Sequence, residues 1–113
     1  MRIAITVSDP WDLGEAIEWK LLEGQVVKLV DDNQGGRALI RLDEGINYRG
    51  SCWRYLVAEV RHQGDKINAL QSGKKVLGAM IGISDDQANS AQSLVTDHWR
   101  GGLALIGDID PIG

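Results

Sequence analysis

Three strand-like segments follow one another closely in the middle of the chain, and this run constrains the fold more than any other feature. Residues 25–30 (QVVKLV) and 37–43 (RALIRLD) are rich in β-branched or alternating apolar residues, which favours strands. The turn cluster DDNQGG separates them, and the turn-like EGINYRG (44–50) precedes a third segment, SCWRYLVAEVRH (51–62). Strands joined by short turns pair antiparallel, so we expect a mostly antiparallel sheet.

The third segment is apolar on both of its faces. Its side chains alternate between two sets, Trp53, Tyr55 and Val57 on one face and Leu56, Ala58 and Val60 on the other. A strand that is half exposed normally alternates apolar with polar residues, whereas a strand covered on both sides does not. We therefore predict that this strand is central in the sheet and covered on both faces.

Further strands are predicted nearer the two ends of the chain. Residues 2–7 (RIAITV) alternate at period two, and residues 74–84 (KKVLGAMIGIS) and 103–109 (LALIGDI) have similar apolar patterns. In the second of these segments, Gly78 and Gly82 share one face. Glycines inside a strand mark a bulge, a bend or the close approach of another backbone, so they would assist curvature of the sheet.

Three short helical segments are predicted between the strands. An acidic N-cap followed by proline favours a helix over about 10–19. Asp65 can cap a single helical turn, KINALQS, which Gly73 would end. Ser84 and Gln87 have the spacing of a capping box and precede DQANSAQSLV, a third helical candidate.

Together these elements predict a mostly β chain with short helices, of the α+β type. We expect a small, strongly bent antiparallel sheet or a partly open β-barrel of about six strands; the alternative is a two-layer α+β sandwich. The chain has 113 residues, which suits a single globular domain over 1–113.

Charge and cysteine content narrow the classes of function. The net charge is −4, and the tightest basic group is only Lys74 with Lys75, which argues against nucleic acid as a partner. Cys52 is the single cysteine, so no internal disulfide can form. The N-terminal residues lack a signal-peptide pattern, and no apolar run is long enough to span a bilayer. We therefore expect a cytoplasmic protein without a membrane partner.

Several aromatic side chains fall on predicted loops among charged residues. The candidate ligand-binding residues are Trp11, Asp12, Tyr48, Trp99 and Arg100. Loops on a rigid sheet concentrate binding residues, and an indole flanked by carboxylates suits a cationic guest. The competing interpretation is a tryptophan that plugs an open barrel end, because the chain has four Trp and no Phe and Trp must supply aromatic core volume.

Catalytic and metal signals are weak. Cys52 with His98 and Asp97 has the residue types of a cysteine nucleophile, its base and an acid. However, Asp97 adjoins His98, no nucleophile elbow surrounds Cys52, and a lone cysteine is most often a small buried hydrophobe. The soft metal ligands of the chain are Cys52, His62 and His98, and their spacing is not that of a zinc site. No metal or cofactor is expected.

The leading hypothesis is thus a non-enzymatic binding or accessory module. It would use an aromatic, acidic surface to bind a small molecule, cationic in the simplest version, or a partner protein. One alternative is a small hydrolase or transferase that uses Cys52 or His98. The other is a structural subunit whose first and last strands have few charges and pair through exposed edges, with a homodimer as the commonest outcome.

Overall fold

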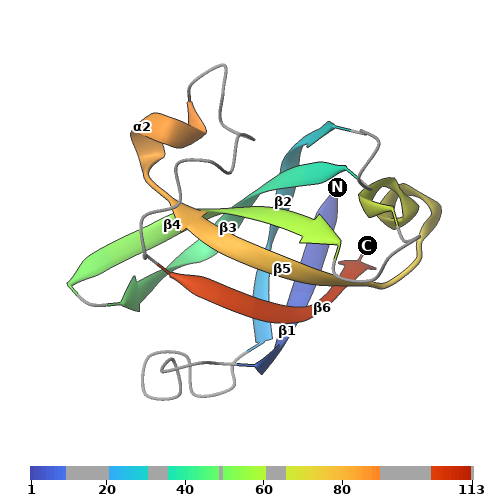
Figure 1. Ribbon diagram of the computed structural model, residues 1–113, viewed down its shortest axis with the longest axis horizontal. Helices are drawn as coiled ribbons and strands as arrows, with labels where there is room; N and C mark the ends of the chain where they lie inside the picture. Colours follow the sequence, from blue (N-terminus) through green and yellow to red (C-terminus); the bar gives the residue numbers. More distant parts are fainter. Residues whose placement is uncertain (10–20, 31–35, 49, 61–65, 90–102, 113) are drawn as a thin grey trace.

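The computed structural model describes residues 1–9, 21–30, 36–48, 50–60, 66–89 and 103–112 (Figure 1). The described elements, in chain order, are β1 (Arg2–Asp9), β2 (Leu21–Val30), β3 (Arg37–Tyr48), β4 (Ser51–Val60), the 3₁₀ helix η1 (Ile67–Ser72), β5 (Val76–Ile83), α2 (Asp85–Ala88) and β6 (Ala104–Ile112). The central hairpins are therefore present as predicted. The helix predicted over 10–19 lies outside the described residues.

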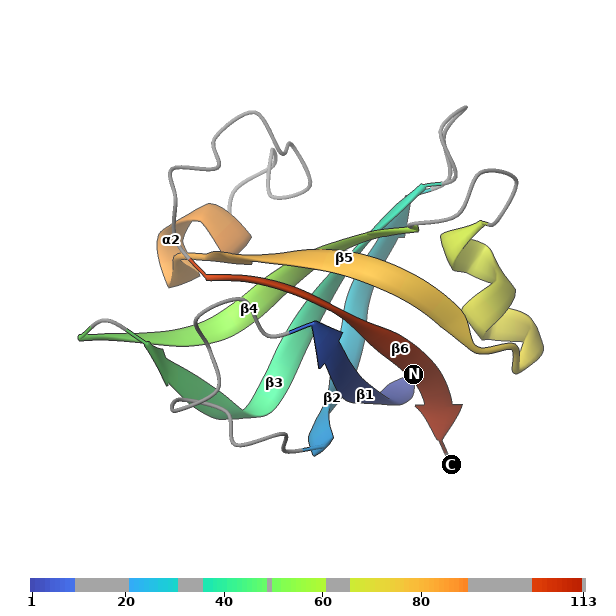
Figure 2. The same ribbon diagram turned by 60° about the horizontal axis from the view of Figure 1, so that its bottom comes forward.

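The six described strands form a closed antiparallel barrel in simple sequence order, β1 to β6 (Figure 2). Closure comes from the pairing of the first and last strands, with Ile5 opposite Ile109. The prediction of a small six-stranded barrel is confirmed, and the barrel is closed rather than partly open. The first and last strands, whose edges the structural-subunit hypothesis would use, pair with each other from Arg2 opposite Ile112 to Asp9 opposite Ile106. That hypothesis stays a prediction.

Antiparallel strands in sequence order place successive connections at alternate ends of the barrel. One end, here called the hairpin end, has the connections β1 to β2, β3 to β4 and β5 to β6, and therefore α2. The other, the η1 end, has the remaining connections, η1 and both chain termini (Figure 1).

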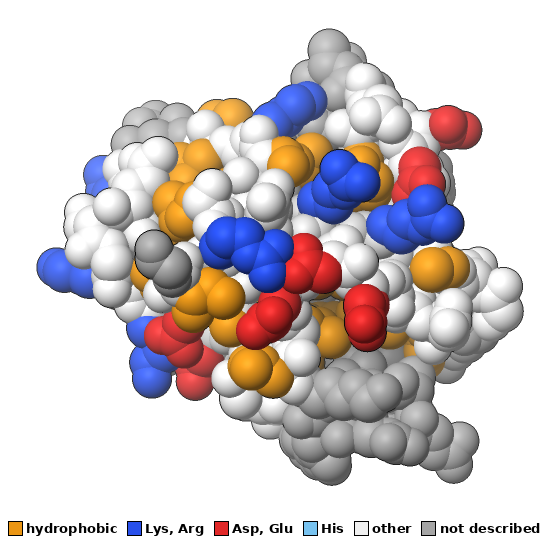
Figure 3. Space-filling model, turned by 180° about the vertical axis from the view of Figure 1, so that it is seen from behind, with side chains coloured by type: hydrophobic (Ala, Val, Ile, Leu, Met, Phe, Trp, Pro, Cys, Tyr) orange, Lys and Arg blue, Asp and Glu red, His pale blue; other side chains and the backbone are white. Residues whose placement is uncertain are grey.

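Side chains that point out of the barrel are largely polar. Arg2, Glu23 and Asp43 lie on β1, β2 and β3 and interact across the outer surface. Figure 3 views the molecule from behind, and basic and acidic side chains lie next to one another across the middle of that face. Neither sign of charge therefore dominates this face.

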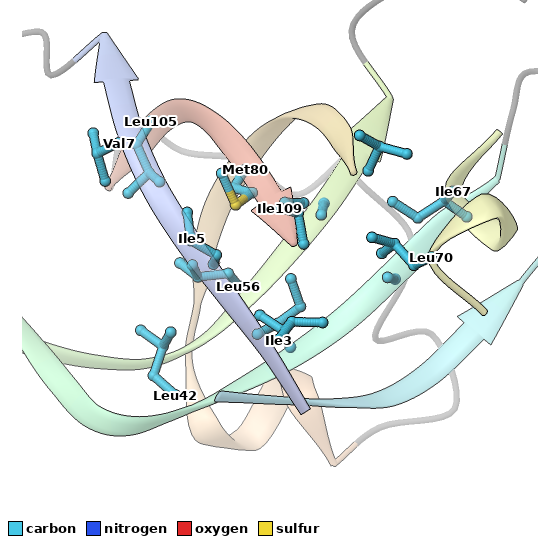
Figure 4. Close-up of a cluster of buried hydrophobic side chains, with 14 of the residues drawn as sticks. Ile3, Ile5, Val7, Leu42, Leu56, Ile67, Leu70, Met80, Leu105 and Ile109 are labelled. Atoms are coloured by element: carbon cyan, nitrogen blue, oxygen red, sulfur yellow. The ribbon is translucent and has the colours of Figure 1, made fainter. Parts of the chain in front are cut away.

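Side chains that point inward fill the barrel with aliphatic atoms (Figure 4). The alternation at period two places every second residue of a strand inside. The fully buried members of this core are Ile3, Ile5, Ala38, Ile40, Leu56, Ala58, Ile67, Leu70, Met80, Leu103 and Ile109. The interior is thus a packed core, which is the usual content of a small barrel.

The prediction that residues 51–62 form a strand covered on both faces is confirmed for the middle of β4, although no strand of a closed barrel is central. Leu56 is buried in the barrel core. Its neighbour Val57 points the other way and is also buried, in a second cluster with Leu39, Ile83 and Ala88. Because Ala88 belongs to α2, this short helix covers part of the outer face of β3, β4 and β5.

Two local predictions need correction. Residues 44–50, predicted as a connection, are mostly strand, because the β3–β4 ladder resumes with Ile46 opposite Trp53. Their glycine and polar residues mark an irregular place inside β3 instead. The N-cap of η1 is Lys66, which has extended backbone angles and no side-chain cap, rather than Asp65, which lies outside the described residues.

The helix-end predictions that depend on local chemistry are confirmed. Gly73 ends η1 in the left-handed conformation, with φ of 83°, which glycine adopts without strain. The Ser84 hydroxyl accepts from the Gln87 backbone N–H, and the Gln87 side chain accepts from the Ser84 N–H. The helix that this capping box starts is only four residues long, from Asp85 to Ala88.

Candidate functional site

A large irregularity in the β3–β4 ladder shapes the hairpin end. Arg41 pairs with Tyr55, and the next pair is Ile46 with Trp53. Residues 42–45 of β3 therefore face only Arg54 of β4. Such bulges bend a strand, re-aim its side chains and occur often beside active sites.

A groove of about 360 Å³ lies at this bulge. Its lining residues are Arg41, Leu42, Asp43, Gly45, Cys52, Arg54, Tyr55 and Asp85. The first four come from β3, the next three from β4, and Asp85 from α2. The lining is mostly charged or hydrogen-bonding, in contrast to the aliphatic barrel interior.

One carboxylate of the groove is held by an arginine outside it. The terminal guanidinium nitrogens Nη1 and Nη2 of Arg2 donate to the two carboxylate oxygens of Asp43, each at 2.6 Å. The hydrogen bond from Arg2 is the main reason that the pKa of Asp43 lies below its ordinary value, and the pKa of Arg2 is raised for the same reason. Glu23 lies 3.7 Å from Arg2 and adds to this group. Asp43 therefore stays ionised, with both of its oxygens engaged.

The two arginines that line the groove are engaged much less. Arg54 Nη1 lies 3.9 Å from Asp85 Oδ2, and both side chains are more than half exposed. An exposed pair at this distance contributes little stability. Arg41 is exposed and makes no hydrogen bond or ion pair with any residue in the described ranges. Two guanidinium groups thus remain available to a ligand.

Cys52 forms part of the groove wall because Gly45 leaves room for it. A Cβ atom at position 45 would overlap the Cys52 Sγ atom. Cys52 is exposed, so the expectation of a small buried hydrophobe is wrong for this cysteine. Its place on β4, opposite Asn47 near the hairpin turn, explains the exposure, since the barrel core lies farther along the strand.

The bulky residue Trp53 lies next to this site and packs toward the barrel interior. Gly82 makes space for the indole, because a Cβ there would lie 2.8 Å from Trp53 Cε3. The indole Nε1 is buried and has no hydrogen-bond partner among the described residues. This packing agrees with the expectation that a tryptophan of the central strand supplies core volume.

The structure describes only part of the predicted ligand-binding and catalytic sets. Tyr48, at the end of β3, is half-buried and packs against the barrel core. Six predicted site residues lie outside the described residues: Trp11, Asp12, Asp97, His98, Trp99 and Arg100. The convergence of Trp11, Tyr48 and Trp99 on one pocket therefore stays a prediction, as does a cysteine nucleophile with His98 and Asp97.

Five groove residues were not predicted from the sequence: Arg41, Asp43, Arg54, Tyr55 and Asp85. The alternation rule assigns Arg41, Asp43 and Tyr55 to unremarkable outward positions on strands, and it places Arg54 on the same face as Leu56. Gly45, in the Asp-Glu-Gly run before Ile46, is the one available signal, because a glycine inside a strand pattern indicates a bulge. Which side chains a bulge gathers depends on the partner strand, and a sequence pattern does not contain that information.

The described residues also contain no cluster of His, Cys, Asp and Glu that could hold a metal ion. None of the described helices is long and apolar enough to cross a membrane. Comparison with known proteins found no family model, no curated protein and no solved structure that matches this chain. The groove itself is the evidence from which a function can be argued.

Proposed function

We propose that this protein is a small, non-enzymatic binding module that takes a small molecule, or a side chain of a partner protein, at the hairpin end of its barrel. The observation that carries this proposal is the groove of about 360 Å³ at the β3 bulge, lined by charged groups of three different elements. Ligand sites are concave and hold polar groups that fix the orientation of the ligand. This groove is concave, and its mostly charged or hydrogen-bonding lining suits a polar ligand.

The connections of the chain add support. The segment that joins β1 to β2 contains Trp11 and Asp12, and the one that joins α2 to β6 contains Trp99 and Arg100. Both segments join strands at the hairpin end, where the groove lies. The connections that contain the aromatic residues selected from the sequence thus begin and end at the end of the barrel that has the groove.

The test is a fragment screen followed by two-dimensional ¹⁵N–¹H NMR. We expect small polar and aromatic fragments to shift backbone signals of residues 41–45 and 52–55. The signals of η1, at the opposite end, should not move. Fragments that shift η1 and leave the groove unchanged, or a set of diverse fragments of which none binds saturably, would contradict the proposal.

Substitutions in the two connecting segments separate recognition from plugging. If Trp99 contacts a ligand, Trp99→Ala should abolish fragment binding and leave the melting temperature unchanged. If it fills the barrel end instead, the same substitution should lower the melting temperature by several degrees, as loss of a buried aromatic does. Trp11→Ala, measured in parallel, applies the same test to the first segment.

A second candidate, a small hydrolase or transferase, is favoured by one observation: the Cys52 thiol is exposed in the groove wall. A nucleophilic cysteine needs a histidine within hydrogen-bond reach, and His62 and His98 both lie outside the described residues. The pH dependence of alkylation of Cys52 tests this role. An activated thiolate reacts quickly below pH 7, whereas an ordinary cysteine has a pKa of about 8.5 and reacts slowly there.

A further inference from the structure

We infer that the groove binds the oxyanion group, a carboxylate or a phosphate, of its ligand, and that Arg41 and Arg54 hold this group. The inference rests on the proposed function, since it assigns the chemical class of ligand to the same groove. It departs from the cationic guest suggested by the sequence, because the described groove has a different balance of charge.

The charged groups that line the groove differ in how strongly they already interact with other side chains. Arg41, Arg54, Asp43 and Asp85 line the groove, two of each sign. The Asp43 carboxylate already receives two hydrogen bonds of 2.6 Å from Arg2, which is not a lining residue. Both of its oxygens are therefore engaged from outside the groove, by an arginine that also lies 3.7 Å from Glu23. The charged lining groups that are not held in short hydrogen bonds are the two guanidinium groups of Arg41 and Arg54 and the carboxylate of Asp85.

The two arginines and Tyr55 line the groove from two neighbouring strands. Arg41 is directly opposite Tyr55 in the ladder, and Arg54 precedes Tyr55 on the same strand. Cross-strand partners have their Cβ atoms about 5 Å apart, so Arg41 and Tyr55 are neighbours, and Arg54 lines the same groove although it is not part of that pair. A guanidinium offers its N–H donors as a planar fork that matches a carboxylate or phosphate, and a tyrosine hydroxyl adds a further donor.

The arginines of the groove would have to break few existing contacts to bind an anion. Arg41 would leave no hydrogen bond or ion pair with a described residue, only the minor charge interaction that helps to lower the pKa of Asp43, and Arg54 would leave only a contact of 3.9 Å with Asp85. An anion would therefore gain charge-assisted hydrogen bonds without breaking strong ones. A cation at Asp43 would have to displace the bidentate pair with Arg2, which leaves Asp85 as the one lining carboxylate without such a partner among the described residues.

The experiment is an NMR titration of the full chain at constant ionic strength with three probes: inorganic phosphate, acetate and choline. We expect saturable shifts of residues 41–45 and 52–55 with phosphate or acetate. The probe with the lower Kd then identifies the oxyanion. Arg41→Gln and Arg54→Gln should each raise that Kd about tenfold, the effect of losing one charge-assisted hydrogen bond.

The matched control is Lys75→Gln, which removes one positive charge from an exposed residue between η1 and β5. It should leave the Kd unchanged, and the NMR spectra report whether each variant stays folded. Equal weakening by Lys75→Gln, or shifts that grow linearly without saturation, would overturn the inference in favour of general charge screening. Saturable binding of choline alone would overturn the anion site but leave the binding function standing. If no probe and no fragment binds at the hairpin end, both proposals fail.

Discussion

The two ends of the barrel are built from opposite kinds of residue. At the η1 end, Ile67 and Leu70 of the 3₁₀ helix are fully buried in the barrel core, and η1 contacts β2, β5 and β6. At the hairpin end, the β3 bulge opens a groove lined by arginines, aspartates and a thiol. One end is closed by aliphatic packing, and the other presents hydrogen-bonding groups to solvent.

This difference separates stability from recognition. Buried aliphatic side chains stabilise the fold through the apolar area that they remove from water. Exposed charged groups contribute little to stability, and they remain available for a ligand. Substitutions at the η1 end should therefore change the free energy of unfolding, and substitutions around the groove should change binding or thiol reactivity instead.

The largest effect is expected for Leu70→Ala, which removes a fully buried side chain from η1. It should lower the free energy of unfolding by about 2–5 kcal/mol through lost apolar burial and the cavity left behind, as measured by urea denaturation. Leu21→Ala is the matched control, because Leu21 is 57% exposed at the start of β2, and it should change stability by about 0.5 kcal/mol or less. Equal effects of the two substitutions would refute the role of η1 as a plug.

The next effect is expected for Gly82→Ala, inside the barrel beside the hairpin end. The new methyl group would lie 2.8 Å from Trp53 Cε3 and 3.1 Å from Leu103 Cβ. Overpacking of this kind costs about 1–3 kcal/mol, again measured by urea denaturation. In a Trp53→Phe background the smaller ring leaves space, so the cost of Gly82→Ala should fall. The same cost in both backgrounds would rule out the indole as its cause.

A smaller effect on stability is expected for Gly45→Ala, although the new Cβ would overlap Cys52 Sγ. Cys52 is exposed, so its side chain can rotate toward solvent, and stability should change by about 0.5 kcal/mol or less. The rate of thiol alkylation should rise, because the displaced sulfur is more accessible. An unchanged alkylation rate, with Gly45→Ala folded, would show that Gly45 does not position the thiol.

The smallest effect is expected for Asp43→Asn, which breaks the exposed pair with Arg2. The pKa of Asp43 is lowered in the folded state, chiefly by the hydrogen bond from Arg2. The pair therefore stabilises the fold above the ordinary carboxyl pKa, and this contribution is lost as the pH falls through the lowered value. The variant should melt slightly below the wild type at pH 7 in low salt.

The difference in melting temperature between Asp43→Asn and the wild type should vanish in strong acid and at high salt. Glu44→Gln removes the same charge from the adjacent exposed position and serves as the control for general charge effects. A difference that persists at low pH, where the wild-type carboxyl is protonated, would mean that loss of the ion pair is not its cause.

Much of the fold could be predicted from local sequence patterns. Alternating apolar residues located the strands, and the two apolar faces of residues 51–62 correctly indicated a strand covered on both faces. The capping box at Ser84 and the left-handed Gly73 were also correctly predicted. Each of these features depends on residues within a few positions of one another, so the sequence contains the required information.

The candidate groove could be predicted only in a small part. Cys52 was selected for its chemistry, and the structure places it in the groove wall rather than in the core. The sequence did not mark Arg41 and Arg54 as site residues, because an exposed arginine is ordinary. Their convergence follows from the register shift between β3 and β4, which no pattern within either strand specifies.

By itself, the sequence determined the strand segments, the antiparallel hairpins at the centre and the chemistry of the helix ends. The tertiary structure decided that β1 pairs with β6 and closes the barrel, that η1 plugs one end, and that a bulge opens a groove near the other. The physical reason is the range of the interactions. Alternation and capping act between near neighbours, whereas closure, register and the Arg2–Asp43 pair join residues that are distant in the chain.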